Sequence, residues 1–158
     1  MPTPKLRWRT KTSWRAKLHK PVQPKLVPVP DGMAGRLGHG MMLIPTALEV
    51  DAMIRKIPRG QVSTLAQIRK RLARWHNADV TCPLVTGIFL RIVAEAAEED
   101  RAAGRADVTP YWRVVREDGR LNAKLPGGAE LQAEQLRAEG HLVEHGKVVM
   151  GKEAAPAA

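Results

Sequence analysis

The sequence is poor in cysteine, in aromatic residues and in long apolar runs. Cys82 is its single cysteine, so no internal disulfide can form, which fits a reducing cytoplasm. Aromatic residues make up only 4% of the chain, so aliphatic side chains must form most of the core. No run of about 18 apolar residues occurs, and the basic N-terminus lacks the apolar segment of a secretory signal. We therefore expect a cytoplasmic protein with no membrane partner.

The sequence also lacks the spacings that mark metal sites and nucleophile–base pairs. Its five histidines are dispersed and none stands at a recognisable spacing from Cys82. No metal and no other cofactor is therefore expected. Cys82 precedes Pro83 at a predicted helix start, where it is either a reactive thiol or a buried structural residue. We favour the structural role.

Basic residues are abundant and unevenly placed. The chain holds 26 Lys and Arg against 16 Asp and Glu, a net charge of +10. Nine of these basic residues and only one acidic residue, Asp31, fall within residues 1–40, which are also rich in proline. We predict that residues 1–40 form a basic arm that binds nucleic acid. Its candidate contacts are Lys5, Arg7, Trp8, Arg9, Trp14 and Arg15. The cations would neutralise phosphates and the indoles would stack on bases, or one or both indoles would pin the arm to the domain.

Residues 41–150 have the helical signals of a folded domain. Thr46 and Glu49 have the spacing of a capping box, and Thr64 predicts a second helix start. Pro83 suits the first turn of a third helix that ends near Gly104, and a fourth helix is predicted over residues 129–139. Apolar periodicity predicts the buried faces. These are Val50, Ile54 and Ile57 in the first helix and Leu65, Ile68, Leu72 and Trp75 in the second. In the third helix, Leu84, Ile88 and Ile92 define one apolar stripe, and Val85, Phe89 and Val93 lie beside it.

Two hairpins are predicted after the third helix. Val114 and Val115 lead into Asp118-Gly119, a dipeptide typical of tight turns. A second hairpin is predicted around His145-Gly146, and residues 151–158 are expected to be a disordered tail. Three helices followed by a hairpin predict a mainly α fold with small β hairpins, a winged helix-turn-helix.

Three short segments, in this order and spacing, resemble parts of a known family. They are Ile57–Thr64 (IPRGQVST), Pro110–Gly119 (PYWRVVREDG) and Leu136–Gly140 (LRAEG). Over about residues 46–143 the chain resembles the DNA-binding domain of alkylguanine-DNA alkyltransferases. It is most similar to their noncatalytic relatives, the alkyltransferase-like proteins.

The resemblance implies that this chain has lost the family's chemistry. The family's active segment reads Pro-Cys-His-Arg-Val-Val, so Tyr111 stands at the alkyl-accepting cysteine and Trp112 at the histidine that helps to deprotonate it. Glu139 matches the glutamate that orients this histidine, and has nothing left to orient. A tyrosine hydroxyl is a poor replacement for an activated thiolate. We therefore expect no catalytic residue and no enzyme activity.

Two further differences concern DNA recognition. The family's recognition helix carries Arg-Ala-Val-Gly, whose arginine replaces the flipped nucleotide in the duplex, and here the segment reads Leu84-Val85-Thr86-Gly87. Leu84 is either a wedge between bases or part of the core. Leu65 stands at the family's nucleotide-rotating tyrosine. Flipping of an alkylguanine is therefore not implied.

We hypothesise a noncatalytic DNA-binding protein that recognises alkylated or damaged DNA for repair. Its partners would be double-stranded DNA and repair proteins, and it would lie in the cytoplasm with the nucleoid. Tyr111 and Trp112 would either stack on a base or fill the pocket, and Arg113 would either contact DNA or pair with Glu139. The candidate DNA-binding residues of the domain are Arg69, Lys70, Arg74, Thr86, Tyr111, Trp112, Arg113, Arg116 and Arg120.

Two other classes of function stay open at this point. One is an enzyme that uses Cys82 or Tyr111. The other is a protein-interaction module in which the acidic end of the third helix, Glu95 to Asp100, contacts a basic partner.

Overall fold

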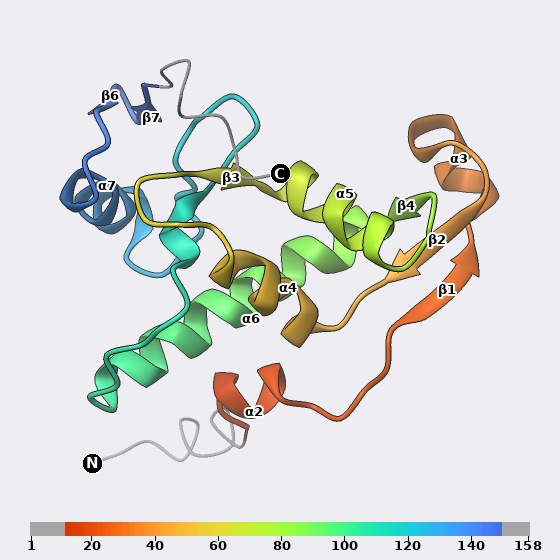
Figure 1. The fold of residues 1–158 in the computed structure, drawn as a ribbon, viewed down its shortest axis with the longest axis horizontal. Helices are drawn as coiled ribbons and strands as arrows, with labels where there is room; N and C mark the ends of the chain where they lie inside the picture. The colour runs from red at the N-terminus through yellow and green to blue at the C-terminus, as the bar shows by residue number, and fades with distance from the viewer. Residues whose placement is uncertain (1–11, 150–158) are drawn as a thin grey trace, which may run out of the picture.

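The computed structural model describes residues 12–149 and shows a mixed α/β fold in which helices dominate (Figure 1). The described part holds six α-helices and three small sheets. The helices are α2 (Trp14–Leu18), α3 (Asp31–Leu37), α4 (Ala47–Arg55), α5 (Leu65–Trp75), α6 (Pro83–Ala102) and α7 (Gly128–Ala138). No helix among these residues is long and apolar enough to cross a membrane.

The strands are short and pair both locally and over long distances. β1 (Lys25–Pro28), β2 (Met41–Ile44) and β4 (Val80–Thr81) form one sheet, in which β1 is antiparallel and β4 parallel to β2. β3 (Ser63–Thr64) pairs in parallel with β5 (Val114–Val115), which follows a 3₁₀ turn, η1 (Tyr111–Arg113). β6 (Val143–Glu144) and β7 (Lys147–Val148) form an antiparallel hairpin.

Helix α6 is the centre of the fold. It runs diagonally below α5 in Figure 1 and contacts α2, α4, α5 and η1. Its buried face includes Leu90 and Val93 together with the small residues Ala94 and Ala97. Small side chains allow neighbouring backbones to approach closely, which explains how so many elements pack on one helix.

The helix starts follow the capping signals of the sequence. Thr46 accepts a hydrogen bond from the Glu49 amide, and the Glu49 carboxylate accepts one from the Thr46 amide, so the predicted capping box is confirmed. Thr64 accepts from the Gln67 amide at the start of α5, and Pro83 occupies the first turn of α6.

The exposed faces of α5 and α6 differ from the periodicity prediction. Trp75, at the end of α5, is 58% exposed because its ring projects beyond the core. Leu84 is 69% and Ile88 52% exposed, since α6 buries the opposite stripe, which includes Thr86 and Leu90. Placing Trp75 on the buried stripe of α5 was therefore wrong, and the apolar stripe of Leu84 and Ile88 faces outward. For Leu84, this exposure excludes the core alternative that the sequence left open.

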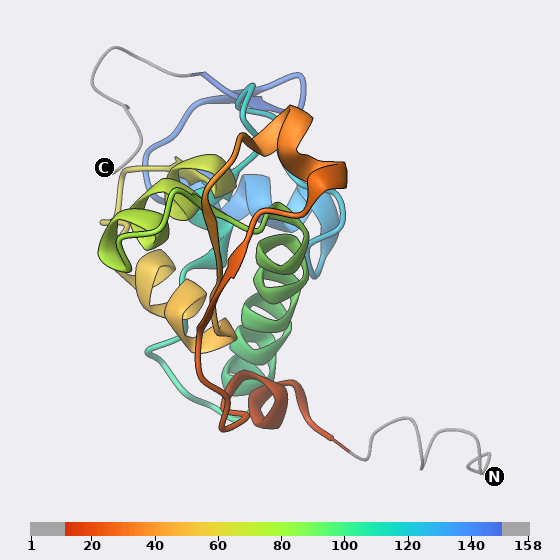
Figure 2. The ribbon, with the colours of Figure 1, turned by 90° about the vertical axis from the view of Figure 1, so that its right-hand side faces the viewer.

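Much of the segment predicted as an arm contacts the domain. Helix α2 packs along α6, and β1 pairs with β2 over four residues (Figure 2). Trp14 packs against the core, and Leu18 is buried in it. Contacts therefore cross the predicted boundary at residue 41. Lys5, Arg7, Trp8, Arg9 and the tail 151–158 lie outside the described residues.

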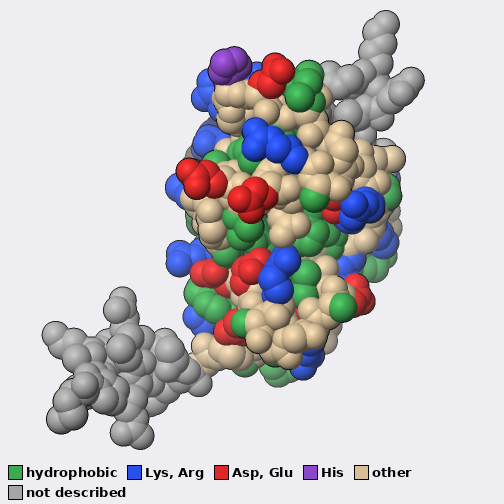
Figure 3. All heavy atoms as spheres, turned by 90° about the vertical axis from the view of Figure 1, so that its left-hand side faces the viewer, with side chains coloured by type: hydrophobic (Ala, Val, Ile, Leu, Met, Phe, Trp, Pro, Cys, Tyr) green, Lys and Arg blue, Asp and Glu red, His purple; other side chains and the backbone are tan. Residues whose placement is uncertain are grey.

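Both predicted turns form, but only the second joins two paired strands. The first turn does not close a hairpin, because β5 pairs with β3. The Arg116 amide donates to the Arg120 carbonyl across the Asp118-Gly119 turn, but β5 pairs with β3 and Arg120 bridges to Lys147. The β6–β7 hairpin turns at His145 and Gly146, which both have positive φ. Opposite charges lie interspersed on the face that carries α7 and this hairpin (Figure 3).

Candidate nucleic-acid interface

The segment that resembles the family's active site lies between α6 and α7, where Tyr111 and Trp112 fill the interior. Tyr111 is 2% exposed and Trp112 8% exposed, and their rings meet edge to face with centroids 5.5 Å apart. The sequence left open whether these two rings stack on a base or fill the pocket, and the structure shows that they fill it. Buried in this way, neither ring is placed to stack on a base.

Tyr111 is fixed by the distal half of α6. Its hydroxyl donates a hydrogen bond of 2.6 Å to the Glu98 carboxylate, which also pairs with Arg101 at 3.3 Å. Burial, followed by the hydrogen bond to Glu98, raises the pKa of Tyr111 well above its ordinary value. The phenol therefore stays protonated at neutral pH.

Trp112 and Arg113 share one buried carboxylate. The Trp112 indole nitrogen donates to Glu139 at 3.1 Å, and the Arg113 guanidinium donates to both Glu139 oxygens at 2.7–3.2 Å. Burial alone would raise the pKa of Glu139, but the hydrogen bonds from Arg113 and Trp112 hold it below its usual range. Glu139 therefore keeps a structural task, contrary to the expectation that it has nothing left to orient. Arg113 also donates to the Ile57 carbonyl, so its side chain is an anchor of the fold.

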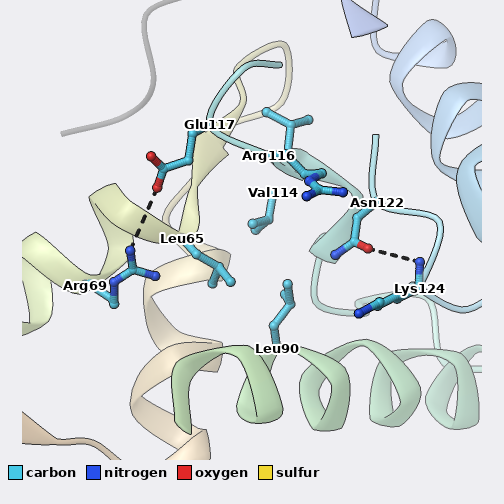
Figure 4. A pocket seen from close by; sticks show the side chains of 9 residues that line it. Leu65, Arg69, Leu90, Val114, Arg116, Glu117, Asn122 and Lys124 are labelled. Carbon is cyan, nitrogen blue, oxygen red and sulfur yellow. Dashed lines mark hydrogen bonds and ion pairs between the residues drawn. The ribbon is translucent and has the colours of Figure 1, made fainter. Parts of the chain in front are cut away.

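A groove opens beside β5. We call it the β5 groove and define it by Leu65, Arg69, Val114, Arg116, Asn122 and Lys124. Its volume is about 330 Å³. Figure 4 shows Leu65, Val114 and Leu90 at its floor, Arg69 and Glu117 on one side, and Arg116 and Lys124 on the other. Three cations and one carboxylate give the lining a net positive charge, which suits an anionic ligand.

Glu117 reduces this positive charge only weakly. The Arg69 guanidinium lies 3.8 Å from the Glu117 carboxylate, whose side chain is 69% exposed. An exposed ion pair of this length contributes little and exchanges readily for another partner. Arg69 and Arg116 thus line the same groove, and their contact with phosphates stays a prediction.

Gln132 of α7 positions both walls of the β5 groove and was missed by the sequence reasoning. It is 2% exposed, and its amide nitrogen donates to the carbonyls of Trp112 and Val114 at 3.0 and 2.8 Å. Its amide oxygen accepts from the Asn122 backbone at 2.7 Å. A buried amide must find partners, but the burial of Gln132 depends on residues distant in the sequence and left no local signal.

The remaining candidate residues of the domain are spread over different environments. Lys70 and Arg74 are exposed on α5, and Arg120 pairs with the nearby Asp118. Thr86 is fully buried, and its hydroxyl donates to the carbonyls of Cys82 and Pro83. Thr86 therefore supports the first turns of α6, and its burial is inconsistent with a DNA contact.

The acidic end of α6 is occupied by contacts within the chain. Glu99 accepts from the backbone amides of Trp14 and Arg15 at 3.0 and 2.9 Å, so it holds the start of α2. Asp100 pairs with Arg15 at 2.7 Å. Arg15 therefore helps to dock α2, and its predicted contact with DNA stays a prediction. Trp14 packs on the domain. This agrees with the alternative in which one or both tryptophans pin the arm to the domain.

Cys82 is buried, and the histidines of the described part of the chain belong to no metal-ligand cluster. Cys82 is 6% exposed at the start of α6. No group of three or more potential metal ligands occurs between residues 12 and 149. His76 contacts Glu49, which links the end of α5 to the start of α4.

Together these features define a small α/β domain with a basic groove. The segment that resembles the family's active segment lies in its closed interior. The chain belongs to the family described as 6-O-methylguanine DNA methyltransferase, DNA binding domain, whose model matches residues 45–141. This match covers more than half of the chain and confirms the resemblance. No curated protein matches the sequence in a direct comparison.

Proposed function

We propose that this protein is a noncatalytic, alkyltransferase-like DNA-binding protein. The observation that carries the proposal is the burial of Tyr111, whose hydroxyl donates to Glu98. Alkyl transfer needs a nucleophile that is both deprotonated and accessible. Tyr111 is neither, because burial raises its pKa and covers its ring.

The residues beside Tyr111 offer no replacement for the missing base. Trp112 has no basic nitrogen, since an indole is a donor only. Glu139 is held in its charged form by Arg113 and Trp112, and its side chain is 4% exposed. Without a base and an exposed acceptor, the segment has a structural task.

Double-stranded DNA is the partner we assign to the β5 groove. Membership of the DNA-binding family supports this assignment, and Arg69, Arg116 and Lys124 supply the positive lining. We read α5 and α6 with the turn after β5 as a winged helix-turn-helix arrangement. Because the interior is filled, altered bases would be distinguished in the groove, without entry into a pocket at Tyr111. The same hypothesis locates the protein in the cytoplasm with the nucleoid. It also gives the protein a role in DNA repair, with repair proteins as further partners.

A binding titration tests this function. Fluorescence anisotropy would compare plain and O⁶-alkylguanine duplexes at two salt concentrations. We expect binding that weakens with salt, because each neutralised phosphate contributes a slope of about 0.9 in log K against log salt. Binding that is absent even at low salt would contradict the proposal and favour an interaction module.

Intact-mass analysis separates binding from chemistry. The protein would be incubated with the alkylguanine duplex, with Cys82→Ser and Tyr111→Phe as companion variants. We expect no mass gain. A stoichiometric gain abolished by either substitution would establish the enzyme alternative, against which the burial of both side chains argues.

The arm is best tested by removing residues 2–11. Deleting residues 1–40 would also remove α2 and β1, which pack on the domain. The shorter deletion removes Lys5, Arg7, Arg9 and Lys11. We expect a smaller salt dependence of DNA binding, and an unchanged slope would remove the arm from the interface.

A further inference from the structure

A hollow of about 300 Å³ lies between the end of α4 and the end of α5. We call it the Trp75 hollow and define it by the described residues that line it, which are Met53, Lys56, Arg71, Arg74 and Trp75. Arg71, Arg74 and Trp75 stand at i, i+3 and i+4, so α5 presents all three on one face. Lys56, which follows α4, lies over the Trp75 ring at 5.7 Å. The hollow therefore joins one aromatic surface to three cations.

These three cations have no ionic partner among residues 12–149. None of them takes part in an ion pair there, whereas Arg69 on the same helix pairs with Glu117. The described lining residues of the hollow include no Asp or Glu. Because like charges held side by side repel each other, a ligand that carries carboxylates would relieve this repulsion.

The Trp75 side chain gives the hollow an exposed apolar surface. It is 58% exposed, while the other tryptophan, tyrosine and phenylalanine rings of residues 12–149 pack in or against the core. Met53, which is buried, adds an apolar part to the lining. Tryptophan, methionine and arginine are enriched in protein interfaces, and tryptophan and arginine often supply most of the binding energy there. The composition of the hollow therefore favours a protein partner.

The Trp75 hollow and the β5 groove open on different sides of α5. Arg69 lines the β5 groove and Arg71 lines the hollow, and residues two apart on a helix are about 200° apart around its axis. Figure 4 shows Arg69 directed toward Glu117, within the β5 groove. The two sets of described lining residues have no member in common. A duplex in the β5 groove would therefore leave the Trp75 hollow open.

Charge and size decide between the possible occupants of the hollow. A second copy of this chain is disfavoured, because two chains of net charge +10 repel each other. A nucleic-acid strand binds along an extended groove with aromatic rings for successive bases, and the hollow offers one exposed ring. A short acidic protein segment suits both features, since its carboxylates pair with the arginines and an apolar side chain covers the indole.

We propose that the Trp75 hollow docks an acidic segment of a partner protein, with one large apolar side chain of that segment packed on Trp75. Arg71 and Arg74 donate to its carboxylates, and Lys56 adds positive charge at the rim. The inference goes beyond the proposed function and does not depend on where DNA binds. If DNA occupies the β5 groove at the same time, the chain brings this partner to the DNA.

The test begins with a display library of random short peptides, selected on the full chain and, in parallel, on its Trp75→Ser variant. We expect the natural chain to enrich peptides that combine several Asp or Glu residues with one aromatic or leucine residue. The enriched peptides are then synthesised with a fluorescent label and titrated by anisotropy. Equal enrichment on the natural chain and on Trp75→Ser, or enrichment on neither, would overturn the inference.

The aromatic surface is tested without a change in charge. Trp75→Ser should weaken peptide binding roughly thirty-fold, the loss typical of a hot-spot residue. Trp75→Phe keeps a flat ring and should retain most of the affinity, which guards against a folding effect. Leu142→Ser is the matched control, because Leu142 is 57% exposed at a different place in the fold. If Leu142→Ser loses as much affinity as Trp75→Ser, the inference fails.

The cations are tested at constant net charge. Arg71→Ala with Arg74→Ala should weaken peptide binding roughly ten-fold and make it less dependent on salt. Arg69→Ala with Arg116→Ala removes the same charge from the β5 groove and should leave peptide binding unchanged. Equal losses in both double variants would mean that the peptides follow net charge alone, which would contradict a specific site.

A titration of Trp75→Ser with a plain duplex separates this inference from the proposed function. We expect this variant to bind the duplex like the natural chain. If duplex binding holds but no peptide depends on Trp75, the proposed function stands and the docking site does not. If peptides depend on Trp75 but no duplex binds, the docking site stands alone. An oligothymidine that binds with the same dependence on Trp75, where no peptide does, would make the occupant a nucleic acid and overturn the inference.

Discussion

Tyr111 and Arg116 belong to the same short segment, yet their surroundings are opposite. Tyr111 is 2% exposed and its one polar atom is hydrogen-bonded, whereas Arg116 is exposed at the rim of an open groove. The same contrast separates Trp112 and Arg113, bound to Glu139, from the loosely paired Arg69. We call the first set, Tyr111, Trp112, Arg113 and Glu139, the closed side.

This contrast shows that replacing the nucleophile and its base need not leave an empty cavity in the fold. Bulky aromatic rings fill the space, and Glu98 and Glu139 take up their polar atoms. A buried polar group without a partner would cost about 1–3 kcal/mol, so this satisfaction stabilises the replaced segment. Substitutions on the closed side should therefore change stability, while those in the groove should change binding.

The largest effect is expected for Arg113→Ala. It leaves the Glu139 carboxylate buried without its ionic partner, which typically costs about 3–5 kcal/mol. Urea unfolding followed by circular dichroism would measure the change. Arg120→Ala, which breaks an exposed pair with Asp118, is the control and should cost less than about 1 kcal/mol. Similar costs for both would show that the closed side is not a buried network.

The same variant makes a prediction about acid. Folding lowers the pKa of Glu139, so its contribution to stability is present above the unfolded pKa of about 4.3 and is lost as pH falls through the folded pKa. The stability deficit of Arg113→Ala should therefore be largest near neutral pH and shrink below about pH 4. If the stability deficit of Arg113→Ala does not change with pH, the charge of Glu139 is not its cause.

Gln132→Leu should have the next largest effect. It keeps the side chain's approximate size but removes three hydrogen bonds, leaving two carbonyls and one amide without their partner. We expect a loss of about 2–4 kcal/mol in unfolding free energy, since each buried group left alone costs about 1–3 kcal/mol and solvent recovers part of this. DNA affinity should fall too, because Gln132 positions Val114 and Asn122. Gln135→Leu on the same helix is a less buried comparison, and an equal loss there would contradict this role.

The ionisation of Tyr111 at alkaline pH can be measured by absorbance without interference, because it is the only tyrosine of the chain. Folding raises its pKa above the ordinary 10.0, so the unfolded chain loses this proton first and stability falls as pH rises past 10.0. Absorbance of the phenolate should therefore appear together with unfolding seen by circular dichroism. Phenolate formation near pH 10 in a folded chain would show that the ring is accessible.

Tyr111→Phe is the matching stability test and should have a smaller effect. It keeps the ring and removes the hydrogen bond to Glu98, so we expect a cost of roughly 1–2 kcal/mol in urea unfolding. It should also remove the part of the alkaline instability that Tyr111 causes.

Local signals made part of this structure predictable from the sequence. Thr46 and Glu49 fix a helix start through their own hydrogen bonds, and Gly119 and Gly146 permit positive φ in tight turns. The short segments around Tyr111 indicated the family, which the family match confirms. Arg69 and Arg116 were predicted as contacts from charge alone, and whether they bind DNA stays a prediction.

The rest depends on contacts between distant residues. Periodicity places Leu84 on an apolar stripe, but which stripe of α6 is buried depends on the elements that pack around it, including α2. The contact between Glu99 and the backbone of α2 spans 84 residues and leaves no pattern in the sequence. Gln132 was missed for the same reason, since its partners lie on η1, β5 and a loop.

The most direct test of the account compares the two sides in one DNA titration. Arg69→Ala with Arg116→Ala, Tyr111→Phe and the natural chain would be titrated with the same duplex over a series of salt concentrations. We predict that the groove variant loses about 1.8 from the salt slope, as for two phosphate contacts, while Tyr111→Phe binds like the natural chain. A groove variant with unchanged affinity and slope, or a Tyr111→Phe variant that loses as much binding as the groove variant, would contradict the account.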